Sequence, residues 1–341
     1  MTDLPLGGKR ILFFSPKFFG YEKEILHEME KMGAKVVFHS HLPSEHPWIK
    51  GLFRLFPKIA WFFSDIFFFS WLEKCHLQSF DLILIVKGEG LSPKFIESLR
   101  KRYLSAHIVI YLWDSTLNCK HVELKYPYID EIFSFDPVDC DRITRFKYRP
   151  LFFLNKYLNE ANSPSGHGLF FIGTLNGDRP KVICRFLESL KQEVLFDYWL
   201  FVRSKIELIL RKCFDPYLRK LDSTRLLFIP MPAETTVLHL KDCAAVLDME
   251  HPKQNGLTMR TFEVIASGKK LITTNKFIKD HDFYDPSRIC VIDRNNPSIP
   301  VDFLKSEVAP LSIEFTSKYS LRGWIMEILG VAPISGKKLI V

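Results

Sequence analysis

The sequence has few of the features that mark secreted, zinc-binding or membrane-spanning proteins. Its 341 residues include seven cysteines, and no two of them form a CxxC pair. That spacing argues against a disulfide framework and a zinc site, and it favours reduced thiols in the cytoplasm. The first ten residues, MTDLPLGGKR, lack the apolar core of a signal peptide. No apolar run reaches the roughly 18–20 residues that a transmembrane helix needs. We therefore expect a cytoplasmic protein.

Signatures of nucleic-acid and dinucleotide binding are missing as well. The sequence has no GxGxxG string and no helix-turn-helix, zinc or RNP pattern. Its net charge of +8 favours an acidic partner, such as nucleotide phosphates or anionic lipid. Because this charge is diffuse, nucleic acid is the weakest option, and we expect no nucleic-acid partner.

Short apolar strands and amphipathic helices alternate along the chain, which predicts an α/β fold with parallel sheets covered on both faces. The expected strands are Arg10–Phe14, Lys35–Phe38, Leu82–Val86, His107–Leu112, Glu131–Phe135, Leu169–Ile172, Tyr198–Val202, Leu226–Ile229, Ala244–Leu247, Lys270–Thr273 and Cys290–Ile292. The clearest expected helices are Tyr21–Met32, Arg179–Lys191 and Tyr319–Leu329.

The composition changes near the middle of the chain. Residues 155–168, NKYLNEANSPSGHG, lose apolar periodicity and are rich in Asn, Ser, Pro and Gly, which is typical of a linker. The alternation of strands and helices then restarts, so we expect two Rossmann-like domains of similar size. The expected division is an N-terminal domain at 1–154, a linker at 155–168, a C-terminal domain at 169–317, a terminal helix at 318–330 and a tail at 331–341.

Two helix starts carry specific signals. Ser92 before Pro93 predicts a capped helix that runs to about residue 103, and Asp136 before Pro137 predicts another start. The second start bears on Asp139–Asp141, which is formally a DxD metal-binding pattern. We interpret these acids as the first turn of the helix, where they complement its dipole.

The stretch 247–275 predicts a βαβ unit. A short strand ends at Asp248, a polar loop contains Gly256, and Thr258 opens an apolar helix that carries Arg260 and Glu263. A helix start offers free N–H groups to an anion, and a guanidinium suits phosphate. The unit therefore suits a pyrophosphate with a nucleoside attached. The alternative is an ordinary capped helix with an i,i+3 ion pair between the arginine and the glutamate.

Four segments resemble glycosyltransferases of the GT-B class. QNGLTMRTFEVIASGKKLITTN at 254–275 is similar to the donor-binding signature of the CgeB-like and capsule or lipopolysaccharide synthesis branch. YLWDSTLN at 111–118, FSFDPVDCD at 133–141 and FIGTLNGDR at 171–179 add to the resemblance. It implies two Rossmann-like domains facing each other across a cleft, with the nucleoside-diphosphate sugar on the C-terminal domain and the acceptor on the other.

The resemblance also implies which residues bind the donor. They are Gly173, Thr174, Arg179, Asn255, Gly256, Thr258, Arg260 and Glu263. Thr258 and Arg260 would meet the diphosphate and Glu263 the ribose, with no metal ion and no cofactor. Retaining members of the class often have a second glutamate eight positions earlier. Here Asn255 stands at that position, so retention and inversion both stay open.

Two acids are candidates for a general base that would activate an acceptor hydroxyl. Asp114 follows the strand His107–Leu112, and the carboxyl ends of parallel strands face the ligand crevice. Glu89 follows Leu82–Val86, between two glycines. The alternatives are an Asx-turn or helix cap at Asp114 and a plain turn at Glu89.

A group of three histidines, His39, His41 and His46, follows the second strand. A zinc site needs firmer spacing and a carboxylate or thiolate partner. We expect solvated loop histidines.

The most aromatic segment is WIKGLFRLFPKIAWFFSDIFFFSW at 48–71. Pro57 is expected to kink or split the helix. Aromatic residues beside Lys and Arg are typical of a helix on an anionic membrane surface. Two core helices beneath the first sheet are the equal alternative. Contact with a membrane through residues 48–74 would place the protein on the inner face of the cytoplasmic membrane.

The resulting hypothesis is a GT-B glycosyltransferase that moves a sugar onto an acceptor hydroxyl in bacterial lipopolysaccharide or capsule synthesis. Its partners would be the nucleotide-sugar donor and a glycan or lipid-linked glycan acceptor. A nucleotide-sugar epimerase or hydrolase of the same fold stays open, and so does a non-catalytic sugar-nucleotide-binding assembly protein.

Overall fold

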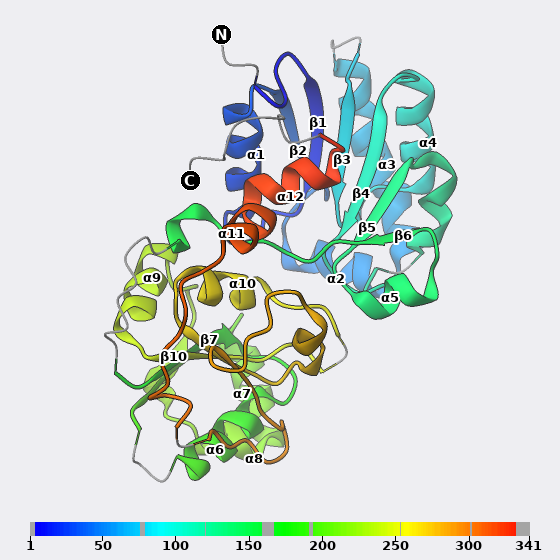
Figure 1. Cartoon of the computed structure of the whole chain (residues 1–341). Helices are drawn as coiled ribbons and strands as arrows, with labels where there is room; N and C mark the ends of the chain where they lie inside the picture. Colours follow the sequence, from blue (N-terminus) through cyan, green and yellow to red (C-terminus); the bar gives the residue numbers. More distant parts are fainter. Residues whose placement is uncertain are drawn as a thin grey trace. The chain divides into compact units, whose positions relative to one another are not determined.

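The structure of the chain is a computed structural model. It describes residues 4–75, 79–119, 121–158, 167–190, 194–252, 254–300 and 302–331. The chain forms two compact units, which are described separately here (Figure 1). The first unit contains residues 1–151 and 317–341, and the second unit contains residues 152–316.

The first unit is built on a six-stranded parallel sheet of order β2-β1-β3-β4-β5-β6. Its strands are β1 Arg10–Ser15, β2 Lys35–Ser40, β3 Leu82–Val86, β4 His107–Leu112, β5 Glu131–Ser134 and β6 Phe146–Tyr148. The central runs LILIV and HIVIYL are almost wholly buried because helices cover both faces of the sheet. Its helices are α1 Tyr21–Lys31, α2 Pro47–Leu55, α3 Pro57–Lys74, α4 Pro93–Arg102, α5 Pro137–Arg142, α12 Leu321–Ile328 and the 3₁₀ helix η1 Val122–Tyr128.

The second unit repeats the same plan with the order β12-β11-β10-β7-β8-β9, again with every strand pair parallel. Its strands are β7 Leu169–Thr174, β8 Phe196–Phe201, β9 Leu226–Leu227, β10 Ala245–Asp248, β11 Lys270–Thr273 and β12 Ile289–Val291. Its helices are α6 Arg179–Ser189, α7 Lys205–Phe214, α8 Pro216–Lys220, α9 Ala233–Asp242 and α10 Met259–Ala266. It also contains the 3₁₀ helices η2 Asn155–Tyr157, η3 Ser223–Arg225 and η4 Lys276–Asp280. Helix α11, Ile313–Tyr319, begins in the second unit and ends in the first.

Each sheet has one point where the strand order reverses. In the first sheet it lies between β1 and β3, and in the second between β7 and β10. Loops that leave neighbouring strands at such a point part in opposite directions, so a crevice opens at the carboxyl ends of the strands. The two points are therefore where functional side chains are expected.

Most predicted elements are confirmed. The strands β3, β4 and β11 have the predicted bounds, and Ser92, Asp136 and Thr258 are helix caps as expected. The predicted split at Pro57 is also confirmed, because α2 ends at Leu55 and α3 begins at the proline. Sequence reasoning missed β6, α7 and α9; β6 is three residues at a sheet edge with one buried side chain, which leaves no apolar run to detect.

The ends of the two units differ from the division expected from the sequence. The terminal helix α12 belongs to the first unit, where it packs against α1 (Figure 1). The expected linker at 155–168 begins inside the second unit, with η2, and its residues 159–166 lie outside the described residues, as does nearly all of the expected tail. Within the described part of the chain, no helix is both long and apolar enough to traverse a bilayer.

Candidate functional sites at the two sheet edges

The start of α10 lies at the strand reversal of the second sheet. Thr258 caps the helix by accepting a hydrogen bond from Thr261 N at 3.3 Å. The hydroxyls of both threonines donate to Asp248 Oδ2, each at 2.7 Å. Asp248 ends β10 and is 5% exposed. One buried carboxylate therefore fixes the first turn of α10 to the carboxyl end of the strand.

Arg260 and Glu263 form the ion pair that the sequence left as an alternative. Arg260 Nη1 lies 2.9 Å from Glu263 Oε2. Glu263 is 1% exposed, whereas the arginine side chain is 21% exposed. Burial raises the pKa of Tyr157, whose hydroxyl is hydrogen-bonded to Arg260 and lies near Glu263. In this arrangement the guanidinium is accessible in part, and the carboxylate expected to hold a ribose is enclosed.

The end of β7, at Gly173 and Thr174, forms a compact junction with Arg179. Arg179 donates to Thr174 O at 2.8 Å and to Met249 O at 2.7 Å. Burial lowers the pKa of this guanidinium, while Asp248 acts in the opposite direction. A Cβ at Gly173 would lie 3.1 Å from Arg179 Nη1. The arginine thus ties the ends of β7 and β10 together, and the glycine makes room for it.

The loop before α10 is held by the side-chain amide of Asn275. Asn275 Nδ2 donates to Asn255 O at 2.9 Å and to Gly256 O at 3.3 Å. Asn275 is buried and also caps η4. These contacts place Arg179 at the ends of β7 and β10, Thr258 at the end of β10, and Asn255 and Gly256 beside Asn275, which follows β11.

Sequence reasoning missed a charged cluster at the same edge. Arg294 Nη1 lies 2.9 Å from Glu250 Oε1, and its Nε lies 3.2 Å from Asp178 Oδ2. Thr274 Oγ1 donates to Glu250 Oε2 at 2.5 Å, and burial raises the pKa of that carboxyl. Each of these residues follows the end of a different strand, which is the signal that could have found them.

At the first sheet the structure joins the two candidate bases through a lysine. Lys87 Nζ lies 2.6 Å from Asp114 Oδ2 and 3.2 Å from Glu89 Oε1. Burial lowers the pKa of Lys87, but the two acids together outweigh it and raise the pKa above its ordinary value. The three side chains are 22–31% exposed. Sequence reasoning missed Lys87, although it directly follows β3.

The loop that carries Glu89 is fixed by side chains from α3 and η1. Trp61 Nε1 donates to Glu89 O and Ser64 Oγ donates to Gly90 O, both at 2.7 Å. Lys125 Nζ donates to Gly88 O at 2.7 Å and lies 5.2 Å from the centre of the Trp61 ring. A Cβ at Gly90 would lie 2.2 Å from His41 O. The glycines therefore serve the turn and its packing.

The DxD pattern has a structural role. Asp139 accepts hydrogen bonds from Thr116 N and Thr116 Oγ1, both at 2.7 Å. It lies in α5 directly after the predicted start, so the helix interpretation is confirmed. In the described ranges, no group of three or more histidine, cysteine or acidic side chains is arranged to hold a metal ion.

The expectation of solvated histidines was wrong for two of the three. Strand β2 continues to Ser40, so His39 lies in the sheet, among Phe14, Phe68 and Trp71. Burial lowers the pKa of His39. His41 is buried as well. The predicted strand end was two residues too early, which explains the error for the half-buried His39, whereas His41 is buried in the loop that follows the strand.

Known proteins resemble this chain in structure and not in sequence. No protein-family model and no curated protein matches the sequence. HepE from Anabaena, in complex with UDP and glucose, has a TM-score of 0.57 at 11% identity, over 94% of this chain and 98% of that one. AviGT4, a glycosyltransferase involved in avilamycin A biosynthesis, has a TM-score of 0.54 at 11% identity, over 94% and 96% of the two chains. The catalytic domain of starch synthase IV from Arabidopsis thaliana, bound to ADP and acarbose, has a TM-score of 0.52 at 11% identity, over 84% and 88%.

These similarities cover both sheets and confirm the fold class. The chain has the GT-B fold of two Rossmann-like domains. The cleft between the domains and the CgeB-like branch stay predictions.

Proposed function

We propose that the protein is a glycosyltransferase that uses a nucleoside-diphosphate sugar. The observation that carries the proposal is the anchored start of α10 at the strand reversal of a GT-B sheet, where Asp248 fixes Thr258 and Thr261. Backbone N–H groups at a helix start favour a diphosphate. The neighbours bound to UDP and to ADP support a nucleotide ligand for this fold.

In the proposed reaction an acceptor hydroxyl attacks the anomeric carbon of the sugar. The bond between that carbon and the diphosphate oxygen breaks, and the nucleoside diphosphate leaves with the electron pair. The start of α10 and Arg260 stabilise the leaving charge in place of a metal ion. If the configuration inverts, Asp114 takes the hydroxyl proton as general base, with Glu89 as the second candidate.

We place this activity in the synthesis of a bacterial surface polysaccharide, on the inner face of the cytoplasmic membrane. The acceptor in this proposal is a glycan or a lipid-linked glycan. Support comes from the resemblance of residues 254–275 to that branch and from the aromatic residues of α2 and α3.

The test is a thermal-shift screen of the full chain with UDP, GDP, ADP and CMP. A nucleotide that binds the folded state at a hundred times its Kd raises the free energy of unfolding by about 2.7 kcal/mol. We expect a shift with one of the diphosphates and its loss in the double variant Thr258→Ala/Arg260→Ala. A shift that survives in the variant would refute the phosphate site.

The matched control is Thr316→Ala. Thr316 lies on α11 and is half-buried, and among the contacts of the described chain its hydroxyl bonds only to carbonyls of its own helix turn. This variant should keep the full nucleotide shift. Turnover of the donor sugar without any acceptor would favour the epimerase or hydrolase alternative.

A further inference from the structure

One face of α2 and α3 exposes a large apolar surface. Its members are eight large side chains on the two helices and the turn between them: Trp48, Leu55, Phe56, Ile59, Phe62, Phe63, Ile66 and Phe67. Trp48 is 83% exposed and Phe62 is 68% exposed. We call this set the α2–α3 face. Large contiguous apolar surfaces on a folded protein mark an interaction site.

On α3 the exposed side chains of this face form one stripe and are not scattered single residues. On α3 the exposed positions 59, 62, 63, 66 and 67 follow the i, i+3, i+4 spacing of one helix side. The opposite side of the helix is buried, at Ala60, Trp61, Ser64, Phe68 and Leu72. The helix is therefore apolar on two sides, and the fold of the first unit covers only one of them.

The sequence of this segment has more basic than acidic residues, which favours an anionic partner. Between Trp48 and Leu72 the sequence has three basic residues, Lys50, Arg54 and Lys58, and a single acid. That acid, Asp65, accepts a hydrogen bond from Ser92 Oγ at 2.5 Å, and burial raises its pKa. The face thus has little negative charge to repel an anionic partner.

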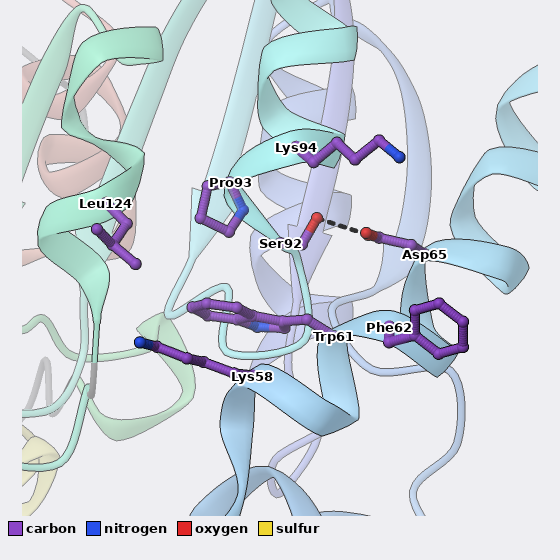
Figure 2. A pocket seen from close by; sticks show the side chains of 8 residues that line it. All are labelled: Lys58, Trp61, Phe62, Asp65, Ser92, Pro93, Lys94 and Leu124. Carbon is purple, nitrogen blue, oxygen red and sulfur yellow. Dashed lines mark hydrogen bonds between the residues drawn. The ribbon is translucent and has the colours of Figure 1, made fainter.

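A surface pocket of about 440 Å³ lies beside the face (Figure 2). Phe62 of the α2–α3 face lines it together with Lys58 and Lys94. Figure 2 shows the two lysines on opposite sides of the pocket, with Ser92 and Asp65 between them. Both lysines are exposed. Aromatic residues flanked by lysines match the boundary between acyl chains and headgroups of a bilayer.

We propose that the α2–α3 face docks the protein on a bilayer that carries anionic lipids. The aromatic stripe enters the headgroup boundary, and Lys58 and Lys94 lie at the level of the headgroup phosphates. The proposed function includes a location at the membrane, and this proposal names the surface that makes the contact. It rests on the proposed function only for the reason why the protein would bind a membrane. The competing partner for the α2–α3 face is a second copy of this chain.

The same helix links this face to the candidate acceptor edge. On its buried side Trp61 and Ser64 hold the backbone of Glu89 and Gly90. A bilayer that receives the outer side of α3 therefore lies one helix diameter from the loop that carries a candidate base, about 10–12 Å. Such a position suits an acceptor anchored in the lipid.

Sedimentation of the full chain with vesicles tests the docking. Vesicles of neutral phosphatidylcholine are compared with vesicles in which a share of the lipid is anionic phosphatidylglycerol. The variant Phe62→Ser/Phe63→Ser/Ile66→Ser/Phe67→Ser changes only exposed positions. It should lower the vesicle partition coefficient on the order of a hundredfold, because each side chain contributes several buried carbons. Lys58→Glu/Lys94→Glu should remove the preference for anionic vesicles, an effect of about tenfold or more.

Helix α7 of the second unit provides a matched control. It also exposes apolar side chains at helical spacing, namely Ile206, Ile209, Leu210 and Phe214. The variant Ile206→Ser/Ile209→Ser/Phe214→Ser should change vesicle binding less than about twofold. Wild-type binding by the α3 variant would overturn the proposal, and so would loss of binding in the α7 variant alone.

Two further measurements separate this proposal from its rivals. A concentration-dependent dimer of the wild type that the α3 variant abolishes, without vesicle binding, would assign the face to a second copy of the chain and overturn lipid docking. Nucleotide binding in the thermal-shift screen does not depend on lipid. The proposed transferase and the proposed docking can therefore fail independently.

Discussion

The candidate bases of the first sheet and the acids around the start of α10 are held in opposite ways. At the first sheet, Glu89 and Asp114 share Lys87, and all three side chains are partly exposed. At the second sheet, Asp248 and Glu263 are buried, and each has its partners within the same unit. A carboxylate that must exchange a proton with a substrate needs access to it, whereas one that fixes a loop needs burial and a full set of hydrogen bonds.

Under the proposed function, this difference gives the two edges different roles. Glu89 and Asp114 are suited to act on an acceptor, and Lys87 holds them near one another. Asp248 is suited to fix the helix start whose N–H groups would receive the diphosphate. The predictions below test that assignment, beginning with the largest expected effect.

The first edge is tested by removing its acids one at a time. Asp114→Asn keeps the shape and removes the basic oxygen, so we expect kcat for sugar transfer to fall by about 10²–10⁴. Glu89→Gln should lower kcat much less, because Glu89 is only the second candidate for the base. Steady-state kinetics with the donor found in the nucleotide screen measure both variants.

The opposite ranking would assign the base to Glu89. If both variants are as active as the wild type, neither Asp114 nor Glu89 is the general base. The nucleotide-induced thermal shift should be unchanged in both variants, which separates a lost base from a lost donor site.

The second edge is tested by removing its buried carboxylate. Asp248→Ala leaves the hydroxyls of Thr258 and Thr261 without their charged acceptor. Hydrogen bonds to a charged group contribute about 1.5–3 kcal/mol each, so losing two of them should lower the free energy of unfolding by about 3–6 kcal/mol. Urea unfolding measures the loss.

The single variants Thr258→Val and Thr261→Val are the matched controls for Asp248→Ala. Each removes one donor and should cost about 1–3 kcal/mol. A loss below 1 kcal/mol for Asp248→Ala would mean that the carboxylate does not fix the start of α10.

A pH dependence of stability is expected from Lys125, which holds the loop of the first edge. Burial lowers its pKa from 10.5 to about 8. Between these values the unfolded chain binds more protons than the folded one, so the free energy of unfolding rises with pH. The gain, relative to Lys125→Met, should reach about 3 kcal/mol at the alkaline end.

The measurement for Lys125 is chemical unfolding of both proteins from pH 7 to pH 10.5. Other groups titrate in that range, and the difference between the two proteins isolates the lysine. A difference that stays constant with pH would show that the charged form is not penalised by burial.

Features that depend on residues close together in the sequence could be predicted, and contacts between residues far apart in the sequence could not. The strands β3 and β4 were predicted because burial on both faces makes them continuous apolar runs. The start of α10 was predicted because Thr258 is a local capping signal. Both signals depend on residues that are neighbours in the chain.

The clusters at the sheet edges could not be derived in this way. Arg294 follows β12, and it reaches Glu250 and Asp178 because the order β12-β11-β10-β7 brings the ends of these strands to one edge of the sheet. Lys87 reaches Asp114 because β3 lies beside β4. Strand order decides both contacts, and the apolar pattern of a strand does not encode its neighbour. The sequence therefore located the candidate edges and missed several of the side chains at them, among them Lys87 and Arg294.

The smallest expected effect concerns the packing of the first edge. A Cβ at Gly90 would lie 2.2 Å from His41 O, a backbone atom that cannot turn away, so Gly90→Ala should lower the free energy of unfolding by about 1–3 kcal/mol. Gly51, in α2, is the matched control, because nothing lies within 4 Å of its Cβ position. Gly51→Ala should raise the free energy of unfolding by up to about 1 kcal/mol, since alanine favours a helix. Urea unfolding of both variants gives the comparison, and equal stability of Gly90→Ala and the wild type would show that the Glu89 loop yields easily, which would weaken the case for a preorganised base at this edge.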